Sequence, residues 1–383
     1  MFYILESETT SGTNSEWNSQ CQMTNLTALT VSKTGTIYIS TSDNDTNGFP
    51  IAKLFRLKIR NSQANFTKRS AAENTTDNVD TSKFKTICPQ CPVKAAFGNL
   101  TAVNQVHKPF VNRLITAFLE DYYNPGSFFF STSESLWKLA SDGTIELFLG
   151  DPTGEDKYYA EGNSSVARFR EINVMIQYNE TTLLIGDILS NCVCTYNAKT
   201  DWVTQLVGYC DESQRKTIKL KADQKVPANT RLFGGVSCLV LLKRKDLLLV
   251  LDKNYKKIYQ YNFTTKMVKL LHNDLQETLS EPHDMIASED EQKLYVFDAV
   301  GLSVINLEEF EVLRLIEDPD GPSYNRDWLF KSGSFQQASI GRINKLKWLV
   351  PDQLLVTLGT DANEMMIFID LKGEQVYTAC EGM

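Results

Sequence analysis

The chain of 383 residues contains only three histidines, no excess of positive charge and no long apolar run. Lys and Arg number 39 against 47 Asp and Glu, which gives a formal net charge of −8. Proteins that bind nucleic acid usually present a basic surface, so this balance argues against nucleic acid as a partner. The longest apolar candidate, residues 238–251, is interrupted by the charged stretch 243–246. We therefore expect no transmembrane helix within the chain, because such a helix needs about 20 apolar residues.

Signatures of common catalysts are lacking as well. No Gly-x-Ser-x-Gly motif occurs, which leaves the nucleophile elbow of the α/β-hydrolases without support. Of His107, His272 and His283, only the last opens an expected inner strand, and a zinc site needs several ligands at suitable spacing. The motif Cys88-Pro-Gln-Cys91 lies in no βαβ context and has no second CxxC, which favours a local structural disulfide. We predict no catalytic residue, no metal and no cofactor.

The compartment is indicated by cysteines and glycosylation sequons. Eight cysteines permit four disulfides without proving them. Asn-x-Ser/Thr occurs eight times, about twice the number expected from random placement, at Asn25, Asn44, Asn65, Asn74, Asn99, Asn163, Asn179 and Asn262. Residues 1–6 are too short for a signal peptide, so a secreted protein would already have lost its signal. We predict a secreted or cell-surface glycoprotein; the alternative is a cytosolic protein with chance sequons and free thiols.

Short apolar runs bounded by turn residues dominate the chain, and almost no helical period is present. One unit recurs: two apolar strands joined by a polar turn, followed by a third strand and often a fourth. Four-stranded sheets bury both faces when they stack around a ring. We predict an all-β single domain over residues 1–383, a six-bladed β-propeller of four-stranded antiparallel blades. The expected blades are 21–60, 109–150, 168–210, 232–272, 281–317 and 338–381, with insertions at 61–108, 150–168, 211–231 and 317–337.

Two units resemble NHL repeats. Residues 161–169, Glu-Gly-Asn-Ser-Ser-Val-Ala-Arg-Phe, precede a strand pair that ends in Asp187 and a closing strand that ends in Gly208. The segment from Asp320-Gly321 to Gly333-Ser334-Phe335 is similar. The resemblance is partial in the other four units, and units one and two lack the aspartate that ends the second strand. It implies a propeller fold and says little about activity.

Ring closure requires a fastener between the first and last blades. We expect a Cys21–Cys380 disulfide there, and residues 2–5 as an added strand of the last blade. Cys194 and Cys210 fall on successive outer strands, which predicts a bridge within one blade; Cys192 is an alternative to Cys194. For each cysteine the other possibility is a buried free thiol.

The starts of the inner strands are expected to rim the channel. Polar residues expected there are Asn112, Arg113, Asn173, His283, Asp284 and Asn344. A cation site would draw on such oxygen ligands, so a metal-dependent lyase or hydrolase with its site in the channel is the alternative function. Turn-type polar residues are nevertheless ordinary at these positions.

The insertions favour a binding protein. Residues 215–225 are basic in an otherwise acidic chain and include Lys216, Lys219 and Lys221. Residues 324–335 contain the aromatic and arginine side chains that are typical of interface hot spots, namely Tyr324, Arg326, Trp328 and Phe330. A solvated loop or a segment tucked between blades are the plainer alternatives. We predict a non-enzymatic protein–protein interaction or adhesion module whose partner is another extracellular or membrane protein.

Overall fold

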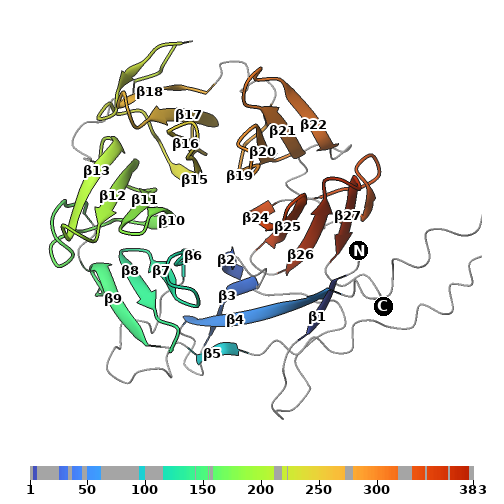
Figure 1. The fold of residues 1–383 in the computed structure, drawn as a ribbon, viewed down its shortest axis with the longest axis horizontal. Helices are drawn as coiled ribbons and strands as arrows, with labels where there is room; N and C mark the ends of the chain where they lie inside the picture. The colour runs from blue at the N-terminus through green and yellow to red at the C-terminus, as the bar shows by residue number, and fades with distance from the viewer. Residues whose placement is uncertain are drawn as a thin grey trace, which may run out of the picture.

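A computed structural model describes residues 3–6, 26–32, 37–44, 50–61, 95–99, 115–142, 144–153, 155, 158–210, 218–221, 223–271, 279–317, 330–340, 343–360 and 363–378. These residues form strands and turns only, gathered into six antiparallel sheets. The sheets stand around a central axis like the blades of a fan (Figure 1). The prediction of an all-β chain with a propeller arrangement is confirmed. Within the described residues, no helix is long and apolar enough to cross a membrane.

Five consecutive sheets contain the regular four-stranded blade, with strands ordered from the axis outward. They are β6 to β9 (Ala117–Glu120, Phe128–Thr132, Ser135–Leu139, Ile145–Gly150), β10 to β13 (Ile172–Asn179, Thr182–Asp187, Cys192–Asn197, Trp202–Gly208), β15 to β18 (Val236–Leu242, Leu247–Asp252, Lys257–Asn262, Met267–Leu270), β19 to β22 (Asp284–Ala287, Lys293–Asp298, Gly301–Asn306, Val312–Glu317) and β24 to β27 (Ile343–Val350, Gln353–Thr360, Asn363–Asp370, Gln375–Thr378).

The N-terminal sheet departs from this pattern. Its strands β2 (Leu26–Val31), β3 (Ile37–Asn44) and β4 (Pro50–Asn61) follow one another outward, but the fourth place is taken by β1 (Tyr3–Glu6). A further strand, β5 (Ala95–Asn99), also pairs with β4. The expectation that residues 2–5 extend the last blade is therefore wrong, because Tyr3 pairs with Asn61 of the first sheet. The prediction of six four-stranded blades is thus too high: five sheets contain the regular blade, and the N-terminal sheet diverges from it.

Two insertions contribute a short outermost strand to the blade that follows them. Strand β14 (Val226–Pro227) pairs with β18, and β23 (Gly333–Ser334) pairs with β27. Gly162 forms the equivalent bridge to Val203 at the start of β13. In each case the next residues turn and place apolar side chains in the core, such as Ala167 and Ala338. Within the segments that resemble NHL repeats, Gly162 and Gly333–Ser334 thus pair along the outer edge of a blade.

Apolar runs explain the second strand of each blade. Strands β11, β16 and β20 have sequences TLLIGD, LLLVLD and KLYVFD, and their last five residues are buried. A strand covered on both faces reads as a continuous apolar run. The turns before β16 and β20 each contain a residue at positive φ, Asp246 at 53° and Glu291 at 60°. Such residues fit the tight hairpins that join antiparallel neighbours.

The core lies between the blades. Hydrophobic clusters join β6–β9 to β10–β13, β10–β13 to β14–β18, and β19–β22 to β23–β27. Aromatic pairs cross these interfaces: Phe148 and Tyr196 have ring centroids 5.1 Å apart, and Tyr295 and Trp348 have centroids 5.6 Å apart. The inner strands contact one another in the order β2, β6, β10, β15, β19, β24 and back to β2. Face-to-face burial between consecutive sheets therefore holds most of the ring together, and the inner strands β2 and β24 make the described contact between the first and last sheets.

Candidate functional site in the central channel

The inner strands enclose a cavity of about 1110 Å³ along the axis of the ring. Every inner strand lines it, together with the turns that lead from the first to the second strand of several blades. We call the end at which the inner strands begin the upper mouth, and the end with these turns the lower mouth. A cavity of this size is in the range that holds small organic ligands, so the channel is the natural candidate site.

At the upper mouth, side chains of one inner strand bind the backbone of the next. The hydroxyl of Thr116, just before β6, donates to the carbonyl of Ile172 at the start of β10. Asn173 of β10 in turn donates from Nδ2 to the carbonyl of Val236 on β15, at 2.9 Å. The other amide atom, Asn173 Oδ1, is buried with no hydrogen-bond partner in the described structure. These polar residues therefore fasten neighbouring blades.

The same arrangement continues around the ring. The Cys238 thiol of β15 lies 3.3 Å from the carbonyl oxygen of Met285 on β19. Asp284 accepts from the amide of Leu346 on β24 through Oδ2, at 2.9 Å, and from the amide of Met285 through Oδ1. Burial raises the pKa of the Cys238 thiol, and the charge of Asp284 adds to that rise. Asp284 is thus a buried carboxylate held by backbone donors, and Cys238 stays a protonated thiol at neutral pH.

The lower mouth is fastened by a second set of bonds. The Gln177 side chain accepts from the amide of Tyr122 at 2.8 Å and donates to Asp121 at 3.0 Å. Burial alone would raise the pKa of Asp121, but hydrogen bonds from Gln177, Asn124 and Tyr123 and the charge of Lys138 outweigh it and lower that pKa. Across another interface, the Glu291 carboxylate accepts from the amide of Arg244 at 3.0 Å. The carboxylates at this end therefore also link neighbouring blades.

Two lysines on the last inner strand face the cavity without such a role. Lys345 and Lys347 line the channel and are half-buried. Within the described residues, neither ammonium has a carboxylate within 4.0 Å. Sequence reasoning did not select them, nor Thr116 and Cys238. The sequence feature that could have identified the two lysines is their alternation with apolar residues in Lys345-Leu-Lys347-Trp. Successive residues of a strand point to opposite faces, so the two lysines share one face.

The structure places the predicted rim residues unevenly. Asn173 and Asp284 line the cavity at the upper mouth, and His283 precedes β19, where its amide donates to the Phe297 carbonyl at 2.8 Å. Asn112 and Arg113 lie outside the described residues, as do His107 and His272, and the side chain of Asn344 does too. The described rim thus offers one carboxylate and one amide oxygen.

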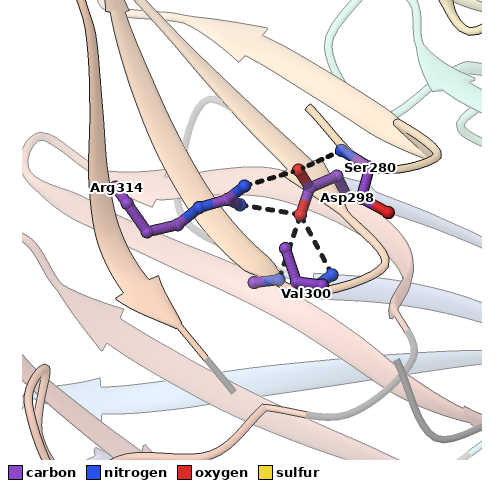
Figure 2. A network of polar contacts seen from close by, with 5 residues as sticks. Ser280, Asp298, Val300 and Arg314 are labelled. Atoms are coloured by element: carbon purple, nitrogen blue, oxygen red, sulfur yellow. Dashed lines mark hydrogen bonds and ion pairs between the residues drawn. The ribbon is translucent and has the colours of Figure 1, made fainter. Parts of the chain in front are cut away.

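A buried aspartate ends the second strand of three blades and organises the upper face. Asp298 accepts from the amides of Ser280, Val300 and Gly301 and forms a two-pronged ion pair with Arg314, at 2.7 and 2.9 Å (Figure 2). This one carboxylate therefore binds the connection that precedes β19, the turn between β20 and β21, and the outer strand β22. Charge-assisted bonds of this kind are stronger than neutral ones, so Asp298 fixes the geometry of its blade.

Asp187 and Asp252 repeat this arrangement. Asp187 accepts from the amides of Arg170, Glu171 and Ser190, and Asp252 from those of Gly234, Asn254 and Tyr255. Burial raises the pKa of both carboxyls, although their hydrogen bonds act in the opposite direction. Their oxygen atoms are occupied by backbone donors, which makes them structural.

The cysteines of β12 correct the predicted disulfide. Cys192, the alternative, pairs with Cys210, and Cys194 is a buried free thiol. The Cys194 sulfur nevertheless lies 3.8 Å from that of Cys210 and 3.9 Å from that of Cys192. The three sulfurs form the group of metal-type ligands found among the described residues, and two of them are joined by the disulfide. Cys21, Cys88, Cys91 and Cys380 lie outside the described residues, so their pairing stays a prediction.

The predicted binding residues lie away from the channel. Lys219 and Lys221 are exposed, shortly before edge strand β14, which places them at the outer rim of a blade. Phe330 is half-buried and packs against the cluster between the β19–β22 and β23–β27 sheets. Lys216, Tyr324, Arg326 and Trp328 lie outside the described residues.

Three sequons have described side chains, and each occupies a turn. Asn179 Oδ1 accepts from the amide and hydroxyl of Thr181, Asn262 Oδ1 from the amide of Thr265, and Asn163 Oδ1 from Ser165. In all three the oxygen is the acceptor, which leaves the Nδ2 atom that carries a glycan out of these turn bonds. The side chains of Asn25, Asn44, Asn65, Asn74 and Asn99 lie outside the described residues.

Comparison with known proteins agrees with the ring of sheets. The chain shares its fold with the luciferin-regenerating enzyme, at 11% identity and a TM-score of 0.50, over 93% of this chain and 92% of that one. It is also similar to a chain of the nidogen/laminin complex (9% identity, TM-score 0.40, 75% and 78% covered) and to the extracellular domain of a one-component system of B. thetaiotaomicron (10%, 0.43, 89% and 32%). No family model matches the sequence. No curated protein matches it either. The chain is a β-propeller protein.

Proposed function

We propose that this propeller is a non-enzymatic interaction module that grips another extracellular or membrane protein through one face of the ring. In this proposal the divergent first sheet completes the ring as a sixth blade of NHL-like type. The single observation that carries the proposal is how the described acids of the channel are used. Of the described acids that line the channel, Asp284 and Glu291 accept backbone amides of a neighbouring blade, and Asp121, which precedes the lining residue Tyr122, accepts from the side chain of Gln177. A rigid ring with decorated loops is a common platform for recognition.

Exposed apolar side chains on the upper face support the proposal. Leu189 is 47% exposed and Tyr255 39% exposed, and they stand on equivalent turns of two adjacent blades. Arg170 donates to the carbonyl of Leu189, and Lys256 pairs with Glu281 at 2.8 Å beside the second turn. Apolar and aromatic groups rimmed by charge are typical of protein-binding surfaces.

A secreted or cell-surface location fits the same proposal. The Cys192–Cys210 disulfide is of the kind that persists in oxidising compartments. The sequons at Asn163, Asn179 and Asn262 lie in turns. Expression through a secretory pathway followed by enzymatic removal of N-glycans tests the location directly. A loss of mass that disappears in variants with Asn→Gln at these positions supports it, and an unglycosylated, retained product contradicts it.

The binding test compares variants of the two proposed contact sets. Biotinylated wild-type chain is used to capture and cross-link partners from the membrane and secreted fractions of the native source, and the affinity for the recovered partner is then measured. Leu189→Ser with Tyr255→Ala, and separately Arg326→Ala with Trp328→Ala, should each weaken binding by about 30-fold, which corresponds to ~2 kcal/mol. Leu313→Ser, at a 62% exposed site on outer strand β22, is the control.

Both the melting temperature and the affinity are needed to judge the outcome. The proposal holds if the contact variants lose affinity while their melting curves match that of the Leu313 variant. It fails if binding survives both pairs of substitutions, or if no partner is recovered and the chain instead turns over a small molecule.

A further inference from the structure

The two channel lysines lie on one side of strand β24. Leu346 and Trp348 alternate with them and pack in the cluster that joins β24–β27 to the β19–β22 sheet. Because alternate residues of a strand point to opposite sides, Lys345 and Lys347 point away from that interface. Both line the cavity, and β2 is the inner strand on that side. Their side chains therefore belong to the channel.

The charge of Lys347 affects the pKa of a thiol on another blade. It lowers the pKa of the Cys238 thiol, against the larger effect of burial. Cys238 lies on β15, which is separated from β24 by the whole of strand β19. Lys347 is also one of the residues that line the cavity.

Neither ammonium is neutralised by the described protein. The nearest described carboxylate of the upper half of the channel, Asp284, accepts backbone amides through both oxygens and forms no ion pair within 4.0 Å with either lysine. The remaining described acids that line the cavity, Glu289, Asp290, Glu291 and Asp352, belong to the turns at the lower mouth. Partly buried ammonium groups without a counter-ion lose hydration that an anion would replace.

We propose that the channel binds a small oxyanion, the carboxylate or phosphate group of a soluble molecule, between Lys345 and Lys347. The lower mouth carries charges of both signs, since Lys243, Arg244 and Lys293 line it beside its acids, so we place the anion between the two lysines of β24. Thr116 and Ser237 also line the channel, and their hydroxyls bond to the carbonyls of Ile172 and Leu251. A ligand held in this way would be independent of the protein partner proposed above, which contacts the exposed surface of the ring.

Citrate and inorganic phosphate are the probes, because they separate carboxylate from phosphate recognition. Binding is measured by titration calorimetry at low ionic strength, where screening is weakest. Trp348, next to Lys347, provides a second signal through its fluorescence, and the Trp348→Phe variant identifies its contribution. We expect saturable binding of at least one anion. The tighter of the two identifies the preferred group.

The decisive variant is Lys345→Gln with Lys347→Gln, which keeps the side-chain length and removes both charges. We expect it to bind the anion at least tenfold more weakly than the wild type. The matched control, Lys199→Gln with Lys372→Gln, removes two charges from exposed turns outside the channel and should bind like the wild type. If the double variant does not fold, the single variants Lys345→Gln and Lys347→Gln serve, and each should weaken binding.

The proposal is overturned if neither anion saturates, or if the channel variant and the surface control weaken binding equally. The second result would mean that the anion responds only to net charge. Loss of protein-partner binding without loss of anion binding would instead concern the interaction surface and leave the channel site standing.

Discussion

Two buried aspartates, Asp252 and Asp121, have pKa values that are shifted in opposite directions by their surroundings. Asp252 ends β16 inside the blade, where burial raises the pKa of its carboxyl in spite of three backbone donors. Asp121 follows β6 at the lower mouth, where Gln177, Asn124, Tyr123 and Lys138 overcome the effect of burial and lower its pKa. A shift in pKa between the folded and unfolded states makes stability depend on pH, with a sign that follows the direction of the shift.

Replacing each aspartate by asparagine should therefore give opposite pH profiles. The folded state of the wild type takes up a proton at Asp252 before the unfolded state does, so the wild type gains stability over Asp252→Asn as pH falls from 7 through the raised pKa. For Asp121 the unfolded state is protonated first, near the ordinary aspartate pKa of 3.8. The advantage of the wild type over Asp121→Asn is complete above that value and is lost as pH falls through the lowered pKa.

Urea unfolding of the wild type and both variants, from pH 7 to pH 3, measures these differences. The penalty of Asp252→Asn should grow toward acid, and that of Asp121→Asn should shrink. Parallel profiles for the two variants would contradict the assigned surroundings, because they would show that both carboxyls shift in the same direction.

The ends of the outer strands show how a backbone requirement is repeated from blade to blade. Gly150 ends β9 with φ of 87°, and Gly208 ends β13 with φ of 90°. A Cβ atom on Gly150 would collide with the carbonyl oxygen of Glu134, and one on Gly208 would lie 2.8 Å from that of Asn191. Glycine is thus needed both for the left-handed conformation and for the close approach of the turn between the second and third strands.

Gly208→Ala should destabilise the protein by about 1–3 kcal/mol or more, the usual cost of a strained backbone plus the displaced carbonyl. Gly126→Ala is the control. Its φ is 83°, but the nearest atom to an added Cβ, that of Ser141, is 3.4 Å away. The denaturation midpoint should therefore fall further for Gly208→Ala than for Gly126→Ala. Equal losses would mean that the conformation alone matters and that the carbonyl yields.

The strand pattern was predictable because each regular strand is four to eight residues long and bounded by turns. β11, β16 and β20 were read as apolar runs ending in aspartate, as they are. Edge strands β14 and β23 were not, because two residues carry no periodicity. The disulfide was assigned to Cys194 instead of Cys192, because the two cysteines stand two residues apart on one face of β12 and a sequence cannot rank them. The position of β1 was not predicted because a short apolar segment can pair with the edge strand of either the first or the last sheet.

At the scale of the whole molecule, ring closure and the candidate site depend on the same inner strands. Asn173 and Asp284, two of the polar residues predicted for the rim, lie on these strands and line the cavity. What the sequence does not contain is their partners, which are backbone groups of the neighbouring blade, 62 or 63 residues away along the chain. Lys345 and Lys347 escaped notice for the same reason, since their surroundings arise only when β24 faces the axis.

This use of the rim residues bears on the alternative of a metal-dependent enzyme. A calcium ion takes six to eight oxygen ligands, usually with several carboxylates. The described upper mouth supplies one carboxylate, Asp284, whose oxygens each accept an amide, and one free amide oxygen, Asn173 Oδ1, which is buried. Such a set would hold a divalent cation weakly.

We therefore expect a chelator to leave the melting temperature unchanged. A ligand that binds only the folded state stabilises it by RT ln(1 + [L]/Kd), so removal of a tightly bound metal would lower the melting temperature by several degrees. The protein is dialysed against excess EDTA, and its melting temperature is compared with that of the same sample after calcium or zinc is restored. A fall reversed by either metal, and abolished in Asp284→Asn, would return the channel to the metal-dependent lyase or hydrolase. The same result would leave the anion site testable, because Lys345 and Lys347 could then bind the acidic group of a substrate beside the ion.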